Sequence, residues 1–366
     1  NSPSVINAAY YQRGFWDGRA ARIFNGYTVT GVAAEAPGAV VLRDGVTVRE
    51  AVRMDNASLA SQAVGPVLNE LEMSYEGRGW EALGRKLLSL RPLGLQKVAG
   101  DDSVLGKLAG AERGLTVSYL EMIQAAFRPA YTEAVEANFP LFWGLALQAY
   151  QSTLVSNETA LDRFLDGDSS ALTAQQRDGM QIFQTTGRCT TCHGGAELSA
   201  AGYTTIGFGR GGGRAFQRTG VRNASEDAGA GAGTFKSIGL RNIELTGPYF
   251  HNGGQATLEQ VVEFYARGGD FPNGAIRPFA ATAAQKAALV EFLRGALTDE
   301  RVRFQRAPFD HPELCVPSGM SAGGENWIGL AAVGAGGHAV PLQTFEELLR
   351  GVGTDGTRAN TMTEAC

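Results

Sequence analysis

The chain has 366 residues, enough for two domains, and 44% of them are hydrophobic and 19% charged, as in an ordinary globular protein with a sizeable core. A net charge of −5 at pH 7, with no block of lysine or arginine, excludes nucleic-acid binding from the expected functions. The most apolar run, 139–155, is interrupted by Gln148, Gln151 and Ser152 and is too short to cross a bilayer. We therefore expect no membrane span and interpret this run as a buried helix.

The first half of the chain is expected to become helical after an N-terminal region without long elements. Residues 1–35 have the pattern of loop and short helix, and the Gly- and Val-rich stretch 36–50 is typical of a hairpin-like insertion. Apolar periodicity predicts helices over Ser58–Leu71, Glu81–Leu90, Ser118–Phe127 and Glu133–Val155. The run 166–170 has the composition of a linker and marks a domain boundary.

Three helix-start signals of one kind occur in the second half. Thr173, Thr257 and Thr282 are each followed three residues later by glutamine at the head of an apolar-periodic segment, which is the pattern of a capping box. The first of these helices is expected to stop at Gly187. After residue 320 the chain is Gly-rich, with one helix predicted near 344–349.

The most specific stretch of the sequence is Cys189-Thr190-Thr191-Cys192-His193. Cys-x-x-Cys-His is the attachment signature of a c-type haem, in which two thiols form thioethers with the porphyrin and the histidine ligates the iron. Two intervening residues let one turn of backbone present both sulfurs, with His193 under the ring. The sequence therefore predicts a small helical cytochrome c domain with a covalent haem.

Covalent haem attachment implies assembly outside the cytoplasm, so we expect a periplasmic or extracellular protein. The two remaining cysteines, Cys315 and Cys366, can then form a disulfide that would hold the C-terminal tail. Two unpaired thiols are the alternative.

Several stretches of the chain resemble the bacterial di-haem cytochrome c peroxidases and their MauG-like relatives. They are Asn1–Asn7, Phe15–Arg19, Gln62–Met73, Cys189–His193, Phe235–Gly269 and residues 298–314. The resemblance implies a mainly α fold with two cytochrome c-like haem domains, long loops and a Gly-rich C-terminal tail. We expect an N-terminal domain of the peroxidatic type over 1–168, a cytochrome c domain with its covalent haem over 169–310, and a C-terminal extension over 311–366.

In this family one haem meets peroxide and the other passes electrons, and the motif at Cys189 matches the electron-transfer haem. No cysteine precedes Cys189, whereas the family's first Cys-x-x-Cys-His lies upstream of the stretch on which this chain starts. Two explanations stay open: an upstream segment with its haem is missing from the chain, or the peroxidatic haem has been lost. We favour the first, because residues that serve that haem in the family are still present.

Four residues match family positions that serve the peroxide chemistry. Gln62 and Glu72 correspond to the polar pair on the distal side of the peroxidatic haem, and Pro66 lines the same pocket. Glu72 would move protons between the oxygens of bound peroxide, as general acid–base catalysis requires. Trp16 corresponds to the tryptophan between the two haems, where an indole can relay an electron. Without the resemblance, Glu72 is interpreted as a solvated helix residue and Trp16 as packing.

Tyr265 occupies the family position of the sixth ligand to the haem on His193. The peroxidases have methionine there and MauG-like enzymes have tyrosine, whose phenolate stabilises ferric and higher states and lowers the potential. The alternative is a tyrosine packed on the haem edge, with His251 or another residue as ligand. The resemblance places His251 near the haem propionates and Arg241 among the haem-binding residues. Met180 is interpreted as a core residue.

Asn1, Thr246 and Pro248 match the interdomain calcium site of the family. A side-chain amide oxygen, backbone carbonyls and water are suitable ligands for Ca²⁺. This site depends wholly on the resemblance, because no carboxylate cluster indicates it in the sequence.

The resemblance therefore implies a c-type haem oxidoreductase that reduces hydrogen peroxide with electrons relayed through the C-terminal haem. Its partners would be a small redox protein as electron donor, or a protein substrate that it oxidises, and a homodimer is compatible with the family. The expected cofactors are haem c, one attached in this chain and a second if an upstream segment exists, and Ca²⁺. The alternative is a mono-haem electron-transfer or structural cytochrome that is no longer an enzyme.

Overall fold

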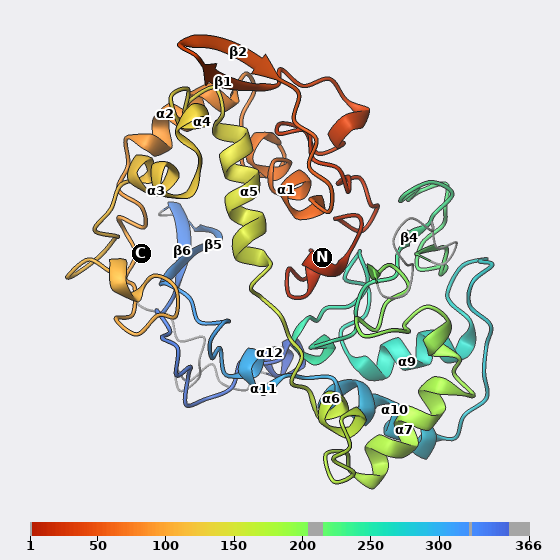
Figure 1. Ribbon diagram of the computed structural model, residues 1–366. Helices are drawn as coiled ribbons and strands as arrows, with labels where there is room; N and C mark the ends of the chain where they lie inside the picture. The colour runs from red at the N-terminus through yellow and green to blue at the C-terminus, as the bar shows by residue number, and fades with distance from the viewer. Residues whose placement is uncertain (1, 204–214, 322–323, 351–366) are drawn as a thin grey trace. The chain divides into compact units, whose positions relative to one another are not determined.

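The computed structural model describes residues 2–203, 215–321 and 324–350, and this part of the chain is mainly helical, which confirms the predicted fold class at that level (Figure 1). It divides into two compact units, each built from separate segments of the sequence. The described residues of unit 1 are 2–19, 154–203, 215–303 and 343–350. Those of unit 2 are 20–153, 304–321 and 324–342.

Unit 2 contains the β-hairpin expected over 36–50. Strand β1 (Ala39–Arg43) pairs antiparallel with β2 (Val46–Glu50). The connecting residues Asp44 and Gly45 both have positive φ, 49° and 78°. Two-residue hairpin turns of this kind need that backbone conformation, which aspartate tolerates and glycine favours.

The helix predicted over Ser58–Leu71 is wrong in length, because Pro66 ends it. Helix α1 covers only Ser58–Ala63, and a 3₁₀ turn follows over Pro66–Leu68. A proline inside a helix lacks the N–H that the preceding turn needs and its ring clashes with that turn. Glu72 therefore lies outside the helix, exposed on a surface turn.

Four further helices complete the N-terminal part of unit 2. They are α2 (Trp80–Leu88), α3 (Tyr119–Ala126), α4 (Pro129–Thr132) and α5 (Phe139–Gln151). Helices α2 and α3 agree with the predicted ranges to within two residues at each end. The predicted helix over 133–155 is wrong at its start, six residues too early.

Asn138 explains the late start of α5. Its buried side-chain amide donates to the carbonyl oxygens of Val40 (2.7 Å) and Tyr131 (2.8 Å) and accepts the Val40 N–H (2.8 Å). Through these bonds the Asn138 side chain connects β1 to the start of α5. The aromatic residues of the unit 2 core include Phe24, Trp80 and Phe139.

The chain returns to unit 2 after residue 303 and adds a second hairpin there. Strand β5 (Leu314–Ser321) pairs antiparallel with β6 (Gly324–Leu330). Just before β5, the buried carboxylate of Glu313 accepts the Lys97 backbone N–H (3.1 Å) and a guanidinium N–H of Arg113 (3.1 Å). Through these two bonds Glu313 connects the segment after residue 303 to the loop before α3.

Unit 1 holds the helices of the second half and one very short sheet. Its elements include α6 (Ala160–Leu165), α7 (Ala174–Gln184), β3 (Phe216–Gln217), β4 (Phe235–Lys236), α9 (Leu258–Arg267), α10 (Ala283–Glu291), α11 (Glu300–Arg303) and α12 (Phe345–Leu349). All three predicted capping boxes are confirmed: the hydroxyls of Thr173, Thr257 and Thr282 each accept the N–H three residues on, and the glutamine there reaches back. Helix α12 begins with the same device at Thr344.

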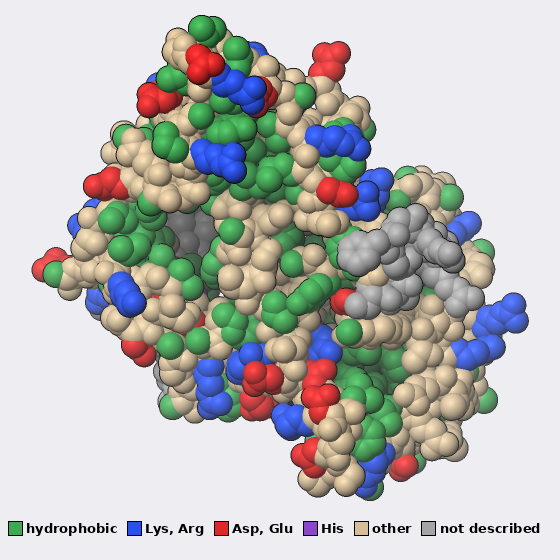
Figure 2. All heavy atoms as spheres, viewed as in Figure 1, with side chains coloured by type: hydrophobic (Ala, Val, Ile, Leu, Met, Phe, Trp, Pro, Cys, Tyr) green, Lys and Arg blue, Asp and Glu red, His purple; other side chains and the backbone are tan. Residues whose placement is uncertain are grey.

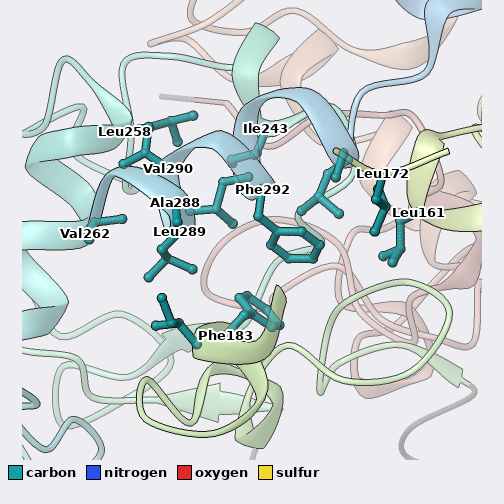
Figure 3. Close-up of a cluster of buried hydrophobic side chains, with 14 of the residues drawn as sticks. Leu161, Leu172, Phe183, Ile243, Leu258, Val262, Ala288, Leu289, Val290 and Phe292 are labelled. Atoms are coloured by element: carbon teal, nitrogen blue, oxygen red, sulfur yellow. The ribbon is translucent and has the colours of Figure 1, made fainter. Parts of the chain in front are cut away.

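The core of unit 1 is organised around α10 (Figure 3). Leu289 of α10 and Phe292 just after it are buried, and the Phe292 ring lies 5.5 Å from the ring of Phe183 on α7. The two helices approach closely at Gly179, where a Cβ would clash with the Ala288 carbonyl oxygen. This packing fixes the C-terminal end of α7, from which the Cys-x-x-Cys-His motif follows.

The N-terminal segment, residues 2–19, belongs to unit 1, whereas the residues directly after it belong to unit 2. The backbone N–H of Asn7 donates to the Leu154 carbonyl (2.9 Å). Its side-chain amide donates to the Ser156 carbonyl (2.9 Å) and accepts the Ser156 N–H (2.7 Å). Further along, the Lys236 N–H donates to the Trp16 carbonyl (2.8 Å). These bonds hold Trp16 within unit 1.

The compact units therefore differ from the ranges 1–168, 169–310 and 311–366 expected from the sequence. The chain passes between units at residue 154, before the linker at 166–170, because Leu161 of α6 belongs to the unit 1 core. The predicted number of haem domains stays a prediction.

The surface drawn in Figure 2 carries interspersed acidic and basic side chains among its described residues. No helix in the described ranges is long and apolar enough to span a membrane. Cys366 and the side chain of Cys315 lie outside the described part of the chain, so their disulfide stays a prediction.

Candidate functional site

The Cys189–His193 motif forms one compact turn after α7. A 3₁₀ turn spans Cys189–Thr191, and the backbone N–H groups of Cys192 (3.1 Å) and His193 (2.8 Å) both donate to the Cys189 carbonyl. Just before it, Arg188 has a left-handed backbone (φ 51°), which redirects the chain at this point. The turn places both thiols and the imidazole on the wall of one cavity, as the spacing predicts.

His193 is held through one of its two ring nitrogens. Nδ1 lies 3.2 Å from the Leu198 carbonyl oxygen and 3.1 Å from that of Ile238. Two acceptors at Nδ1 require the proton there, so Nε2 keeps the lone pair that a metal needs. Burial lowers the pKa of His193, although the two carbonyls act in the opposite direction, and the ring is therefore neutral at pH 7.

The cavity lies within unit 1 and has a volume of about 410 Å³. Cofactor pockets typically fall between roughly 300 and 1,000 Å³ and are mostly apolar with a few polar groups. Apolar lining residues from the core helices include Phe183, Leu258, Val262, Leu289 and Leu293. A flat, largely apolar ring such as a porphyrin suits these walls.

Tyr265 is the polar residue that α9 contributes to the same cavity. Its ring packs against Phe264 (5.4 Å between centroids) and Phe250 (6.1 Å). Within the described ranges its hydroxyl has no hydrogen-bond partner, so it is available to a group in the cavity. Burial raises the pKa of Tyr265, so the phenol stays neutral unless a cation stabilises the phenolate.

Neither Cys189 nor Cys192 forms a disulfide, and both line the cavity. Burial raises the pKa of the Cys189 thiol to about 12, and the nearby Cys192 acts in the same direction. A protonated thiol is a poor metal ligand, and the described residues contain no group of three or more His, Cys, Asp or Glu that could hold a metal ion. The two thiols fit covalent attachment of a haem better than a thiolate–metal site.

A family model matches the first part of the chain. The model described as di-haem cytochrome c peroxidase matches the chain over residues 1–170. The chain is similar to that family over this range. Relatives named as cytochrome c peroxidases align with up to 73% of the chain.

Three curated relatives show the extent of the similarity. The cytochrome c peroxidase of Escherichia coli is 27% identical over 282 residues, which cover 73% of this chain and 42% of the relative. A cytochrome-c peroxidase of Denitromonas iodatirespirans is 36% identical over 174 residues, covering 41% and 47%. The methylamine utilization protein MauG of Methylorubrum extorquens is 31% identical over 178 residues, covering 46% of each chain. The chain thus spans about half the length of the curated relatives it matches.

Solved structures share the fold. A MauG-like protein associated with microbial copper homeostasis aligns with a TM-score of 0.54 at 20% identity, covering 84% of this chain and 77% of the other. The di-haem peroxidase BthA from Burkholderia thailandensis aligns with a TM-score of 0.52 at 19% identity, covering 85% and 75%. At these identities the similarity establishes the fold alone.

Trp16, which is predicted to correspond to the tryptophan between the two haems, lines the cavity of unit 1. Its ring meets His251 edge-on, with centroids 6.0 Å apart. His251 also stacks on Phe235 (3.7 Å), and its Nε2 lies 2.9 Å from the Asp227 carboxylate. Burial lowers the pKa of His251, and Asp227 opposes that shift. The sequence indicated Trp16 and His251 but not Asp227, whose partner lies 24 residues away.

Arg241 lines the cavity but has its main partner elsewhere. Both terminal nitrogens of its guanidinium donate to the Asp162 carboxylate, at 2.6 Å each, and Nε donates to the Ala196 carbonyl at 2.9 Å. The predicted contact between Arg241 and the haem stays a prediction. The structure shows an ion pair between Arg241 and Asp162, and the bond from Arg241 to Ala196 connects this pair to the loop that follows His193.

Tyr11 and Lys236 also line the cavity and were not singled out in the sequence. The Tyr11 hydroxyl is hydrogen-bonded to the Gly239 backbone and the Ser199 hydroxyl, and burial beside Glu197 raises its pKa. No local pattern identifies either residue, because a lone tyrosine or lysine usually packs or lies on the surface.

The other residues predicted to serve peroxide lie in unit 2. Gln62 is half-buried on α1, Pro66 is half-buried in the 3₁₀ turn, and Glu72 is exposed. Their roles stay predictions.

The calcium prediction is likewise untested. The Thr246 hydroxyl donates to the Ile243 carbonyl (3.1 Å), and Pro248 follows a cis peptide bond with Gly247. Asn1 lies outside the described residues.

Proposed function

We propose that this chain is a c-type haem oxidoreductase that acts in the manner of the di-haem cytochrome c peroxidases. The observation that carries the proposal is the meeting of Cys189, Cys192, His193 and Tyr265 at one largely apolar cavity. When bound, the haem supplies a one-electron redox centre. The two thiols would hold its ring covalently, and His193, oriented by the carbonyls of Leu198 and Ile238, would ligate the iron.

Tyr265 would be the second ligand in this proposal. Its hydroxyl is available on the cavity wall, and an iron cation would stabilise the phenolate that burial otherwise disfavours. An anionic oxygen donor favours the ferric state and lowers the reduction potential relative to a thioether. The chain would therefore resemble MauG more than the methionine-ligated peroxidases, and a protein substrate is a candidate source of electrons beside a small redox protein.

The proposed reaction reduces hydrogen peroxide with two electrons and two protons to two molecules of water. Trp16 would relay electrons to and from the haem on His193, since its indole lines the cavity. Glu72, with Gln62 and Pro66, would handle the protons at the haem that meets peroxide. Covalent haem attachment makes a periplasmic or extracellular location part of the proposal.

Peroxide consumption by the haem-loaded, full-length protein tests the proposal. Replacing Glu72 by Gln should lower kcat/KM for peroxide by a factor of about 10² to 10⁴, because the proton-transferring carboxylate is gone. Glu70→Gln is the matched control, since Glu70 is exposed on the same turn. Equal rates for the two variants would remove Glu72 from the reaction.

A second candidate function is electron transfer by a mono-haem cytochrome. It is favoured by the exposure of Glu72, whose carboxylate lies on a surface turn. One haem per full-length polypeptide, by pyridine haemochrome and intact mass, together with no peroxide turnover, would support this candidate over the peroxidase.

A further inference from the structure

A lysine ammonium is buried beside the cavity, and no described residue forms an ion pair with it. Lys236 ends β4, lines the cavity, and is only 6% exposed. Its Nζ donates to the Arg13 carbonyl oxygen (3.0 Å) and lies 4.9 Å from the centre of the Tyr11 ring. Within the described part of the chain it forms no other hydrogen bond and no ion pair.

This arrangement leaves most of the ammonium unsatisfied. An ammonium has three N–H donors, and lysine is almost never fully buried unless it is paired. Burial lowers the pKa of Lys236 to about 8, and Asp17 only partly opposes this. Asp17 instead pairs with Arg19 at 3.0 Å. A buried, unpaired charge is costly, so the site is suited to an anion.

A purely structural role explains only part of the geometry. Lys236 does hold the N-terminal segment, through its backbone N–H on the Trp16 carbonyl and its Nζ on the Arg13 carbonyl. That role uses one of the three ammonium donors, with the charge facing the Tyr11 ring, and leaves two N–H donors unused.

The other cations that line the cavity are differently placed. Arg241 is engaged by Asp162 through both terminal nitrogens, whereas Arg188 and Arg277 are exposed and can be solvated. Among the described residues that line the cavity, Lys236 is thus the buried cation whose N–H donors are not all used. A haem c carries two propionate carboxylates, which are its only charged side groups.

We propose that Lys236 binds a propionate carboxylate of the haem attached at Cys189 and Cys192. This inference rests on the proposed function, since it needs the haem in the cavity. A fixed positive charge near the iron favours the reduced state, so Lys236 would raise the reduction potential and partly offset the effect of an anionic ligand.

The test compares Lys236→Met with Lys286→Met in the haem-loaded protein. Lys286 lies on α10 of the same unit and pairs with Glu263 near the surface (2.6 Å), so it controls for loss of a lysine charge. Lys236→Met should shift the reduction potential to more negative values and shift the carboxylate stretch of ¹³C-labelled propionates in the ferric-minus-ferrous infrared difference spectrum. Lys286→Met should change neither, and Lys236→Arg should restore both. An unchanged carboxylate band and potential in a folded Lys236→Met protein would overturn the proposal.

A second measurement does not depend on the folding of a charge-removing variant. In ferrous, haem-loaded protein labelled with ¹³Cε-lysine, the Lys236 signal is identified by its absence in Lys236→Arg. The groups that face its ammonium are Tyr11, the Arg13 carbonyl and, at longer range, Asp17. A bound carboxylate should keep the pKa of Lys236 well above 8, and titration near pH 8 would contradict the proposal.

The failure of this inference is distinguishable from failure of the proposed function. Protein without haem on Cys189 and Cys192, by mass spectrometry, would refute the proposed function and with it the inference. Protein that carries the haem, but in which Lys236→Met changes neither the reduction potential nor the carboxylate band, would refute the inference alone.

Discussion

Replacing Asp162 by asparagine tests the ion pair between Arg241 and Asp162. The Arg241 and Asp162 side chains are only 11% and 16% exposed, and they meet in a two-point geometry with both distances at 2.6 Å. Arg241 also holds the Ala196 carbonyl, two residues before Leu198, whose own carbonyl orients His193. The substitution removes one charge and leaves Arg241 buried with a neutral partner.

Removing one member of a buried ion pair costs about 3–5 kcal/mol. Because neither side chain is fully buried, we expect a loss near the lower limit, about 3 kcal/mol in the free energy of unfolding. The amide oxygen of the new asparagine side chain can still accept the Thr159 N–H at the start of α6, so the helix cap is kept. Asp162→Ala also removes that cap and should cost about 1 kcal/mol more.

The loss should depend on pH in a defined direction. Burial raises the pKa of Asp162, but hydrogen bonds from Arg241 and Thr159 outweigh burial and leave the pKa below its ordinary value of 3.8. The pair therefore stabilises the fold fully above about pH 5, and its contribution disappears as the pH falls through the lowered pKa.

Urea unfolding of haem-loaded protein at pH 7 and pH 3, followed by circular dichroism, measures both effects. Asp178→Asn is the control, since Asp178 is exposed on α7 of the same unit. A loss below about 1 kcal/mol at pH 7 would be no more than a surface pair gives and would refute the reasoning. If Asp162→Asn lowers the free energy of unfolding as much at pH 3 as at pH 7, that result would refute the reasoning as well.

Three further substitutions test the core, the ligand and the electron path. Phe292→Ala removes a fully buried ring that meets Phe183 and should cost about 3–5 kcal/mol in urea unfolding, whereas a loss under 1 kcal/mol would contradict the packing described. Tyr265→Phe keeps the ring but removes the oxygen, so the ferric absorption and paramagnetic resonance spectra should lose their tyrosinate features; unchanged spectra would remove Tyr265 from the site. Trp16→Phe keeps an aromatic ring beside His251, but phenylalanine is harder to oxidise than tryptophan. Peroxide turnover measured by stopped flow should therefore slow roughly tenfold, equal to about 1.4 kcal/mol in the activation free energy. An unchanged rate would exclude the relay.

The features that could be predicted from the sequence are local ones. The Cys189–His193 turn and the capping boxes depend on residues three or four apart, so their hydrogen bonds follow from spacing alone. The hairpin over 36–50 is similar, because Asp44 and Gly45 set its turn.

The features that could not be predicted depend on distant partners. Asn138 starts α5 late because Val40, 98 residues earlier, uses its side chain. Arg241 meets Asp162 across 79 residues, and Lys236 reaches the Arg13 carbonyl across 223. The composition of each unit is non-local in the same way, since Asn7 joins unit 1 through Ser156, 149 residues later.

The most direct test of the account is tandem mass spectrometry of the peptide that contains Cys189–His193. The protein is to be purified from a host with an active c-type cytochrome maturation system. The account predicts that this peptide carries one haem, bound through the sulfurs of both Cys189 and Cys192. An unmodified peptide, with both thiols free in fully folded protein, would contradict it.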